Sequence, residues 1–168
     1  MTLEPLLQMP PAWTGFSGGL GVHLFRGKLT VGDMDRLDAF GVQWRRRNTA
    51  PTVEMSIVFP SDARMTGEER ARMAQLIKRW EHQRLASATV ILATGMQGAL
   101  QRSVLTGLLL LAPPPHPTKV CSTVREAVTW LGPHLRALAG FDATPEETVA
   151  GVEAFCAAFL ARRGPASA

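Results

Sequence analysis

The sequence predicts a small α/β domain with a mixed or mostly parallel sheet of four or five strands and helices packed on it. Four short apolar runs, each suited to a buried strand, alternate with stretches whose apolar residues recur at helical spacing. A last helical stretch with an apolar stripe follows the fourth run. The four runs are Gly21–Leu29, Val53–Pro60, Ala88–Thr94 and Lys119–Ser122.

The first 19 residues precede this pattern, and we expect them to be a flexible N-terminal segment. They contain three prolines and the Gly18-Gly19 pair, which interrupt regular structure, although Trp13 and Phe16 offer anchors for an extended edge strand. The sequence then predicts the α/β domain over residues 20–138. A C-terminal amphipathic helix and its tail are expected over residues 139–168.

The first two predicted helices each begin at a threonine that can cap them. Thr30 precedes a helix whose apolar residues recur every three or four positions as far as Trp44. Thr66 and Glu69 have the spacing of a capping box, in which each side chain accepts a backbone N–H bond from the other residue. We expect the helix after Thr66 to continue to Leu85.

The third and fourth predicted helices follow the central and last strands. The Gly95–Gly98 turn leads into a strongly apolar helix that ends at Leu111, before three prolines. Thr123 caps the next helix, Val124–Leu131, which a Gly-Pro pair interrupts.

The last predicted helix begins at Thr144 with proline at its first position. It presents an apolar stripe that has to be buried, either on the domain itself or against a second copy of the chain. Such a stripe is a candidate interface. Its main members are Val152, Phe155, Phe159 and Leu160.

Composition limits the classes of protein to which the chain can belong. Its 168 residues, 46% hydrophobic and 19% charged, are typical of one folded domain. The longest apolar stretch, Val104–Ala112, is too short to cross a membrane. The N-terminus lacks the basic start and continuous apolar core of a signal peptide. We therefore expect a cytoplasmic protein without membrane insertion.

A net charge of +4 raises the question of nucleic-acid binding. The one dense basic cluster, Arg45–Arg47, lies at the expected C-terminus of a helix, where cations complement the helix dipole without any partner. The chain also lacks tyrosine, and no aromatic residues are interleaved with this cluster as stacking platforms. These observations favour a solvated helix end and argue against nucleic acid as a partner.

Cysteines and histidines are the residues that most often indicate a metal or a catalytic site. Cys121 and Cys156 fall on expected buried faces, and no CxxC spacing occurs, so we expect neither a metal nor a cofactor. No histidine stands in the sequence beside a nucleophile and an orienting carboxylate, and there is no G-x-S-x-G elbow. A non-enzymatic role is expected. The histidines are His23, His82, His116 and His134.

The turn after the central strand is a candidate ligand-binding site. Ligands bind at the C-terminal ends of the strands in open α/β sheets, and Arg102 stands in the first turns of the following helix. Arg102 can meet an anion there; the alternative is that it is solvated. The turn itself lacks the Lys-Ser/Thr pair of a P-loop and the third glycine of the dinucleotide-binding fingerprint, which favours a simple tight turn. The residues bordering this candidate site are Thr94, Gly95, Gln97, Arg102 and Ser103.

The order of elements, with a preceding edge strand, resembles the STAS and SpoIIAA-like fold of bacterial anti-sigma-factor antagonists. The stretch Arg102–Leu135, RSVLTGLLLLAPPPHPTKVCSTVREAVTWLGPHL, is similar to the tail of STAS-like proteins of myxobacteria and related GC-rich bacteria. The resemblance covers Gly21–Leu135 and is one of pattern. It implies a regulatory or adaptor module that binds another protein, or a second copy of itself as a homodimer.

The same resemblance implies a phospho-switch. Antagonists of that family carry a phosphorylatable residue in a D-S-[ST]-G-like stretch after the second core strand. Here the matching stretch is Arg64–Gly67, in which Thr66 and Gly67 fit but the aspartate and first serine are missing, and Ser61 lies a few residues upstream. Phosphate at a helix N-terminus is electrostatically favoured. A plain helix cap also explains Thr66.

Two functions follow as the main hypotheses, and an enzyme of unrecognised chemistry stays open as a third because fold does not determine function. The first is the regulatory adaptor with a protein partner. The second is a sensor domain that binds a small ligand such as a lipid, a nucleotide or an anion, because related folds resemble lipid- or nucleotide-binding modules.

Overall fold

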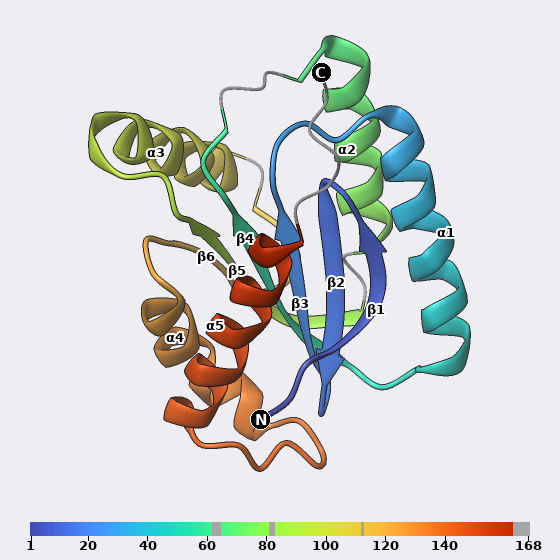
Figure 1. Ribbon diagram of the computed structural model, residues 1–168, viewed down its shortest axis with the longest axis vertical. Coiled ribbons are helices and arrows are strands. Elements are labelled where there is room, and N and C mark those ends of the chain that lie inside the picture. Colours follow the sequence, from blue (N-terminus) through green and yellow to red (C-terminus); the bar gives the residue numbers. More distant parts are fainter. Residues whose placement is uncertain (62–64, 81–82, 112, 163–168) are drawn as a thin grey trace.

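A computed structural model of the chain describes residues 1–61, 65–80, 83–111 and 113–162, and these form an α/β fold (Figure 1). Within these residues six strands make one sheet, in place of the four or five expected. The strands are β1 (Glu4–Met9), β2 (Ala12–Ser17), β3 (Leu20–Phe25), β4 (Thr52–Val58), β5 (Arg84–Ile91) and β6 (Thr118–Cys121). The helices are α1 (Val31–Arg47), α2 (Gly67–Arg79), α3 (Gly95–Leu111), α4 (Val124–Arg136) and α5 (Pro145–Ala161).

The sheet is mixed, and its strand order follows the chain from β1 to β6. The first three strands pair antiparallel, and β3 to β6 pair parallel through α1, α2 and α3. Because crossovers between parallel strands are right-handed, strands added in one direction place their connecting helices on one face. The predicted α/β class with a mixed sheet is confirmed.

Residues 1–19 belong to the sheet and are not the flexible segment expected from their prolines and glycines. The Pro10-Pro11 pair is the turn between β1 and β2. Gly18 and Gly19, with φ of 52 and 85°, form the turn between β2 and β3. A two-residue hairpin turn needs positive φ at its central positions, which glycine adopts without strain. Both breaker pairs therefore join strands.

Two element boundaries also differ from the prediction. Helix α2 ends at Arg79. Leu85 lies in β5, a strand in which more buried and less buried residues alternate from Leu85 onward. Helix α4 continues through Pro133 to Arg136. A proline removes one backbone N–H bond, and here the buried apolar stripe of α4 holds the helix against the sheet.

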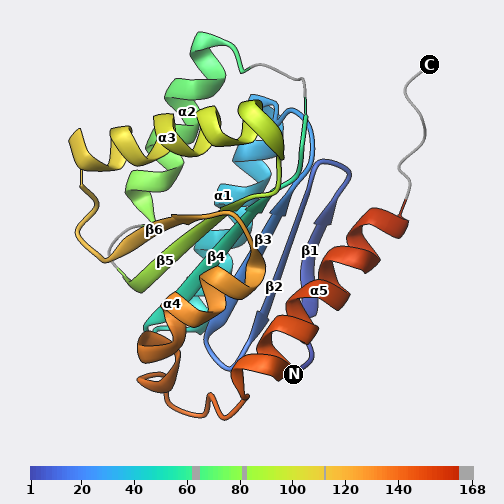
Figure 2. The same ribbon diagram turned by 90° about the vertical axis from the view of Figure 1, so that its left-hand side faces the viewer.

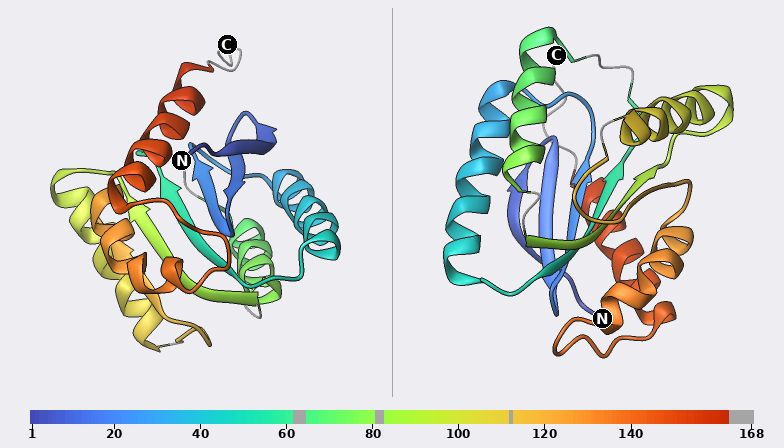
Figure 3. Two further views of the ribbon diagram at one scale, coloured as in Figure 1. Left: turned by 90° about the horizontal axis from the view of Figure 1, so that it is seen from below. Right: turned by 180° about the vertical axis from the view of Figure 1, so that it is seen from behind.

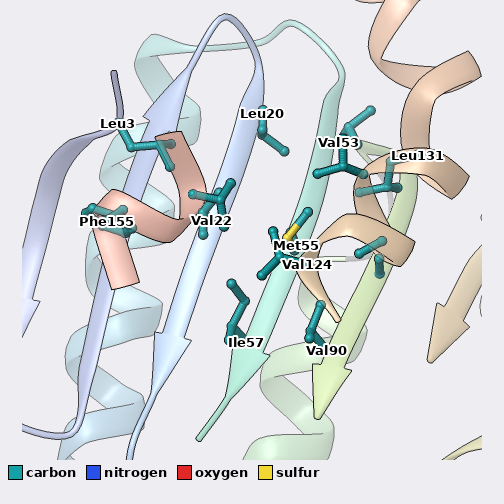
Figure 4. Packing of buried hydrophobic residues seen from close by; sticks show 14 of the residues in the cluster. Leu3, Leu20, Val22, Val53, Met55, Ile57, Val90, Val124, Leu131 and Phe155 are labelled. Carbon is teal, nitrogen blue, oxygen red and sulfur yellow. The ribbon is translucent and has the colours of Figure 1, made fainter. Parts of the chain in front are cut away.

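The main core lies between the sheet and α4 and α5 (Figures 1 and 4). Every second residue of the central strands points to this face and is apolar, as expected for strands that a helical layer covers. Helices α4 and α5 close it with their own apolar stripes. The members labelled in Figure 4 are Leu3, Leu20, Val22, Val53, Met55, Ile57, Val90, Val124, Leu131 and Phe155.

The apolar stripe of α5 is part of this core. Val152, Phe155 and Phe159 are buried within the single chain, and the Phe155 and Phe159 rings both pack on Trp13 of β2. These residues are therefore not an exposed interface, and the described part of residues 139–168 packs on the same sheet as the rest of the domain. Leu160 is the exception, with 43% of its surface exposed.

The opposite face of the sheet carries α1 and α2 (Figure 3) and a much smaller apolar cluster. That cluster is centred on Met9, Ala12, Leu29 and Met34. Helix α3 contacts β5 and β6 towards the β6 edge of the sheet (Figure 2). None of the helices that the structure describes combines the length and apolar character needed to cross a membrane.

Candidate functional site

A cavity of about 490 Å³ lies between the sheet and the layer formed by α1, α2 and α3. Its walls are mostly apolar and come from all three helices, and its floor consists of side chains of β2 to β6. A space of this volume is within the range of small-molecule sites, roughly 300–1,000 Å³. The wall residues include Leu37, Phe40, Trp44, Leu76, Leu105 and Leu109.

The floor of the cavity carries an ionic cluster centred on Glu54 of β4. Glu54 is only 4% exposed. Its carboxylate accepts bonds from Arg45 Nη2 at 3.0 Å and from the Thr52 hydroxyl at 3.2 Å. Arg84 Nε lies 2.5 Å from Glu54 Oε2, and His23 Nε2 lies 3.4 Å from the same oxygen.

These neighbours keep Glu54 ionised. Burial alone would raise the pKa of this carboxyl, but Arg84, His23 and Arg45 outweigh burial and lower its pKa to about 2. The cavity floor therefore holds a buried negative charge at neutral pH. Two guanidinium groups surround it.

Strand alternation explains why so many polar groups reach the same face. In β3, β4 and β5 the residues that do not enter the main core point to α1 and α2, and several of them are polar. His23 is paired with Ser56 in the register of β3 and β4, and Glu54 with Ser87 in that of β4 and β5. Polar side chains from three strands therefore meet under the helices.

Arg45 reaches the cluster from the last turn of α1. Its Nη1 donates to the Gln83 side chain at 2.6 Å, and its guanidinium carbon lies 4.8 Å from the centroid of the Trp80 ring. The Trp80 ring in turn fits against α1 at Gly41, where a Cβ would collide with it. The basic end of α1 thus contributes one residue to the site, which its interpretation as a solvated helix end did not anticipate.

Two hydroxyl–imidazole pairs also line the cavity. The Thr14 hydroxyl lies 3.1 Å from His23 Nδ1, and the Ser87 hydroxyl lies 3.0 Å from His116 Nε2. Ser87 also contacts the Thr118 hydroxyl at 3.0 Å. His23 therefore lies beside a hydroxyl and the Glu54 carboxylate, and His116 lies beside a hydroxyl, although neither stands next to these residues in the sequence. His82 lies outside the described residues.

The burial and the hydrogen bonds of these pairs limit the chemistry that they can do. A nucleophile must reach its substrate, and Thr14 is only 1% exposed. An acyl-transfer site also needs N–H groups aimed at a developing oxyanion. The backbone N–H of Ser87 is already engaged, because it donates to the Pro117 carbonyl at 2.9 Å. The arrangement offers fixed polar contacts on the floor of an apolar space.

The site predicted at the turn after the central strand lies apart from this cavity. Thr94, Gly95, Gln97 and Ser103 are exposed and are not among the cavity-lining residues. Arg102 Nη1 donates to the carbonyls of Ile91 and Ala93, at 3.1 and 3.0 Å, so this side chain ties α3 to the end of β5. The Gly95–Gly98 segment is the first turn of α3 and not a turn before the helix: Gly95 has φ of +63°, and a Cβ at Gly98 would overlap the Ala93 carbonyl.

The candidate phospho-switch residues lie before α2. The Thr66 hydroxyl accepts the Glu69 N–H at 3.2 Å, and Thr66 N–H donates to the Glu69 carboxylate, which completes the predicted capping box. Glu69 also pairs with Lys28. Ser61 is half-buried, and Arg64 lies outside the described residues. Phosphorylation of Thr66 or Ser61 stays a prediction.

Both cysteines have the structural character expected of them. Cys121 is buried in the main core and Cys156 is half-buried on α5, and both are free thiols. Burial raises the pKa of each to about 11, so both stay protonated at neutral pH. Across the part of the chain that the structure describes, no group of three or more His, Cys, Asp or Glu side chains is placed to hold a metal ion.

Comparison of the chain with family models, with curated proteins and with solved structures gave no match. The α/β class agrees with the STAS-like fold that the sequence pattern implies. Membership of that family stays a prediction.

Proposed function

We propose that the protein is a non-enzymatic binding domain for a small organic molecule, which it holds in the cavity between the sheet and α1 to α3. The observation that carries this proposal is the ionic cluster of Glu54, Arg45 and Arg84 at the base of an apolar-walled cavity. Apolar pockets with a few convergent polar groups are the usual form of a small-molecule site.

The two faces of the sheet provide an internal comparison. On the α4–α5 face the residues that β3, β4 and β5 direct into the core are apolar. On the other face these strands carry an ion cluster, which costs desolvation energy and is often less stabilising than a packed apolar core. A purely structural role gives no advantage to the second arrangement. A ligand that contacts the cluster and fills the space above it would give this arrangement an advantage.

Filling the cavity is expected to abolish binding. Ser56 lies on the cavity floor, and Ser56→Phe would place a ring in the space without removing a charged group. Phenylnaphthylamine, a neutral dye whose fluorescence rises in apolar surroundings, serves as the probe. We expect native protein to bind it and Ser56→Phe to bind it at least about tenfold more weakly, equivalent to about 1.4 kcal/mol.

Ser103→Phe is the matched control, because Ser103 is exposed on α3 and does not line the cavity. It should bind the dye like the native chain. Circular dichroism and a cooperative unfolding transition establish that both variants are folded. Failure of the native chain to bind the dye, or equal binding by Ser56→Phe, would contradict the proposal.

The regulatory adaptor implied by the STAS-like resemblance is a second proposal, favoured by the surface of α3. Met96 is 89% exposed, and Leu100 and Leu110 on the same helix are also exposed. Large apolar side chains clustered on one element are typical of a surface that contacts another protein. Helix α3 also lines the cavity through Leu105 and Leu109, so one helix borders both the cavity and this surface.

The adaptor proposal is tested on α3 itself. Leu100→Glu combined with Leu110→Glu changes two exposed side chains, so we expect the unfolding midpoint to stay within a few degrees. A stoichiometric partner that co-purifies with the native chain from its own cells should be lost from this variant and kept by Gln101→Glu. A partner retained by the double variant, or no partner with the native chain, would argue against this surface.

A further inference from the structure

The charged groups on the cavity floor do not balance. Among the described lining residues, Arg45 and Arg84 face a single buried carboxylate, that of Glu54. Lys28 also borders the cavity, but Glu69 already pairs with it at 3.0 Å. The two guanidinium groups of the floor cluster therefore carry one positive charge more than its single carboxylate compensates.

Both guanidinium groups are mostly buried, so this excess charge is poorly screened by water. The pKa of Arg45 is lowered by its burial and by the nearby Arg84, against the opposing effect of Glu54. The two arginines thus repel each other across the carboxylate that they share. A second anion beside them would relieve this repulsion, and the planar fork of a guanidinium is well matched to a carboxylate.

Neutral hydrogen-bonding groups lie on the same strands as Glu54 and Arg84 and line the same cavity. Ser87 lies beside Glu54 in the register of β4 and β5, and Ser56 lies beside Thr89. All three hydroxyl side chains line the cavity, and the Ser87 hydroxyl also contacts His116 and Thr118. Hydroxyl groups can donate to carboxylate oxygens without adding charge. The floor therefore supplies both the charge and the donors for one anionic group.

Away from the floor the lining changes character. The walls contain leucines, methionines and the aromatic rings of Phe40 and Trp44, the latter stacked on Phe16 with ring centroids 3.9 Å apart. Within the described lining there is no second group of unpaired cations that would bind a triphosphate or a dicarboxylate. The ligand body facing these walls has to be apolar.

We propose that the ligand of this cavity is an amphipathic monocarboxylate, with its carboxylate beside Arg84 and Arg45 and its hydrocarbon or aromatic body against α1 and α2. This inference rests on the proposed function and adds the charge and polarity of the ligand to it.

The test compares decanoate, decanol and decyltrimethylammonium, which share a chain and differ in the charge of the head group. The measurement is the displacement of phenylnaphthylamine from the native full-length chain by each of the three compounds. We expect decanoate to bind about tenfold or more tightly than decanol, and decyltrimethylammonium to bind more weakly than decanol. In Arg84→Gln the advantage of decanoate over decanol should fall to about twofold or less. Arg79→Gln, an exposed arginine of α2 outside the cavity, should keep it.

The outcomes distinguish failure of the monocarboxylate inference from failure of the proposed small-molecule binding on which it rests. If decanol displaces the dye as well as decanoate does, the cavity binds apolar molecules and the monocarboxylate inference is wrong. If Arg84→Gln folds and retains the preference for decanoate, the carboxylate binds elsewhere and the inference is also wrong. If the native chain binds neither the dye nor any of the three ten-carbon compounds, the proposed function itself is wrong. Because the three-way comparison uses the native chain, it stands even if Arg84→Gln does not fold.

Discussion

Replacing Phe159 by alanine is expected to lower the free energy of unfolding by about 3–5 kcal/mol, the usual cost of truncating a buried aromatic side chain. Phe159 is only 1% exposed. Its ring meets Trp13 edge-on with centroids 5.5 Å apart and lies 5.6 Å from the ring of Phe59. Truncation would leave a cavity between α5 and the sheet. Urea unfolding followed by circular dichroism measures the loss.

The adjacent residue Leu160 provides the control, since 43% of its surface is exposed. Leu160→Ala should cost less than about 1 kcal/mol, as expected for a largely exposed side chain. Sedimentation of both variants distinguishes a core role from an interface role. A Phe159→Ala protein of native stability that had lost an oligomeric state present in the native chain would show that the stripe serves association.

The α/β class was predictable because strand and helix periods differ and both are strong here. The run Val53–Pro60 indicates a buried strand from its apolar residues alone, and the threonine caps at Thr30, Thr66 and Thr144 mark where three helices begin. The prediction for the start of the chain, residues 1–19, was wrong. Pro-Pro and Gly-Gly pairs are compatible both with a disordered segment and with two hairpin turns. Only the partner strand β3 decides between them.

The stripe on α5 shows a second limit of the sequence. Periodicity established that Val152, Phe155 and Phe159 share a face, and this is confirmed. It did not establish which surface covers that face, because a sheet and a second chain bury an apolar stripe equally well. The choice depends on contacts with Trp13, more than a hundred residues earlier in the chain.

The cavity was missed although part of its signal is present in the sequence. Glu54 and Ser56 in β4, and Ser87 and Thr89 in β5, alternate with apolar residues at a period of two. This pattern indicates one polar face on two runs whose apolar residues predict buried strands. The contribution of Arg45 had no such signal, because an arginine at a helix end is usually solvated. Its contact with Glu54 depends on how α1 packs against the sheet.

Replacing Glu54 by glutamine should destabilise the protein strongly at neutral pH. The change keeps the volume of the side chain and removes the only carboxylate among the described residues that line the cavity, so Arg45 and Arg84 would remain as mostly buried, uncompensated charges. Breaking a buried ion pair from one side typically costs about 3–5 kcal/mol. Asp35→Asn is the control, because Asp35 is an exposed member of a surface ion pair with Arg72, and a change there should cost less than about 1 kcal/mol.

The pH dependence of the stability of the native and Glu54→Gln proteins identifies the cause of the destabilisation. The pKa of Glu54 is lowered from 4.5 to about 2, so its contribution to stability is fully present above pH 4.5 and is lost as pH falls towards 2. A shift of this size corresponds to roughly 3 kcal/mol. Urea unfolding of native and Glu54→Gln proteins should therefore differ by a constant amount between pH 5 and 7 and converge below pH 4.5. A difference that persists undiminished at pH 2 would mean that glutamine fails through altered packing, because protonated Glu54 and glutamine are both neutral.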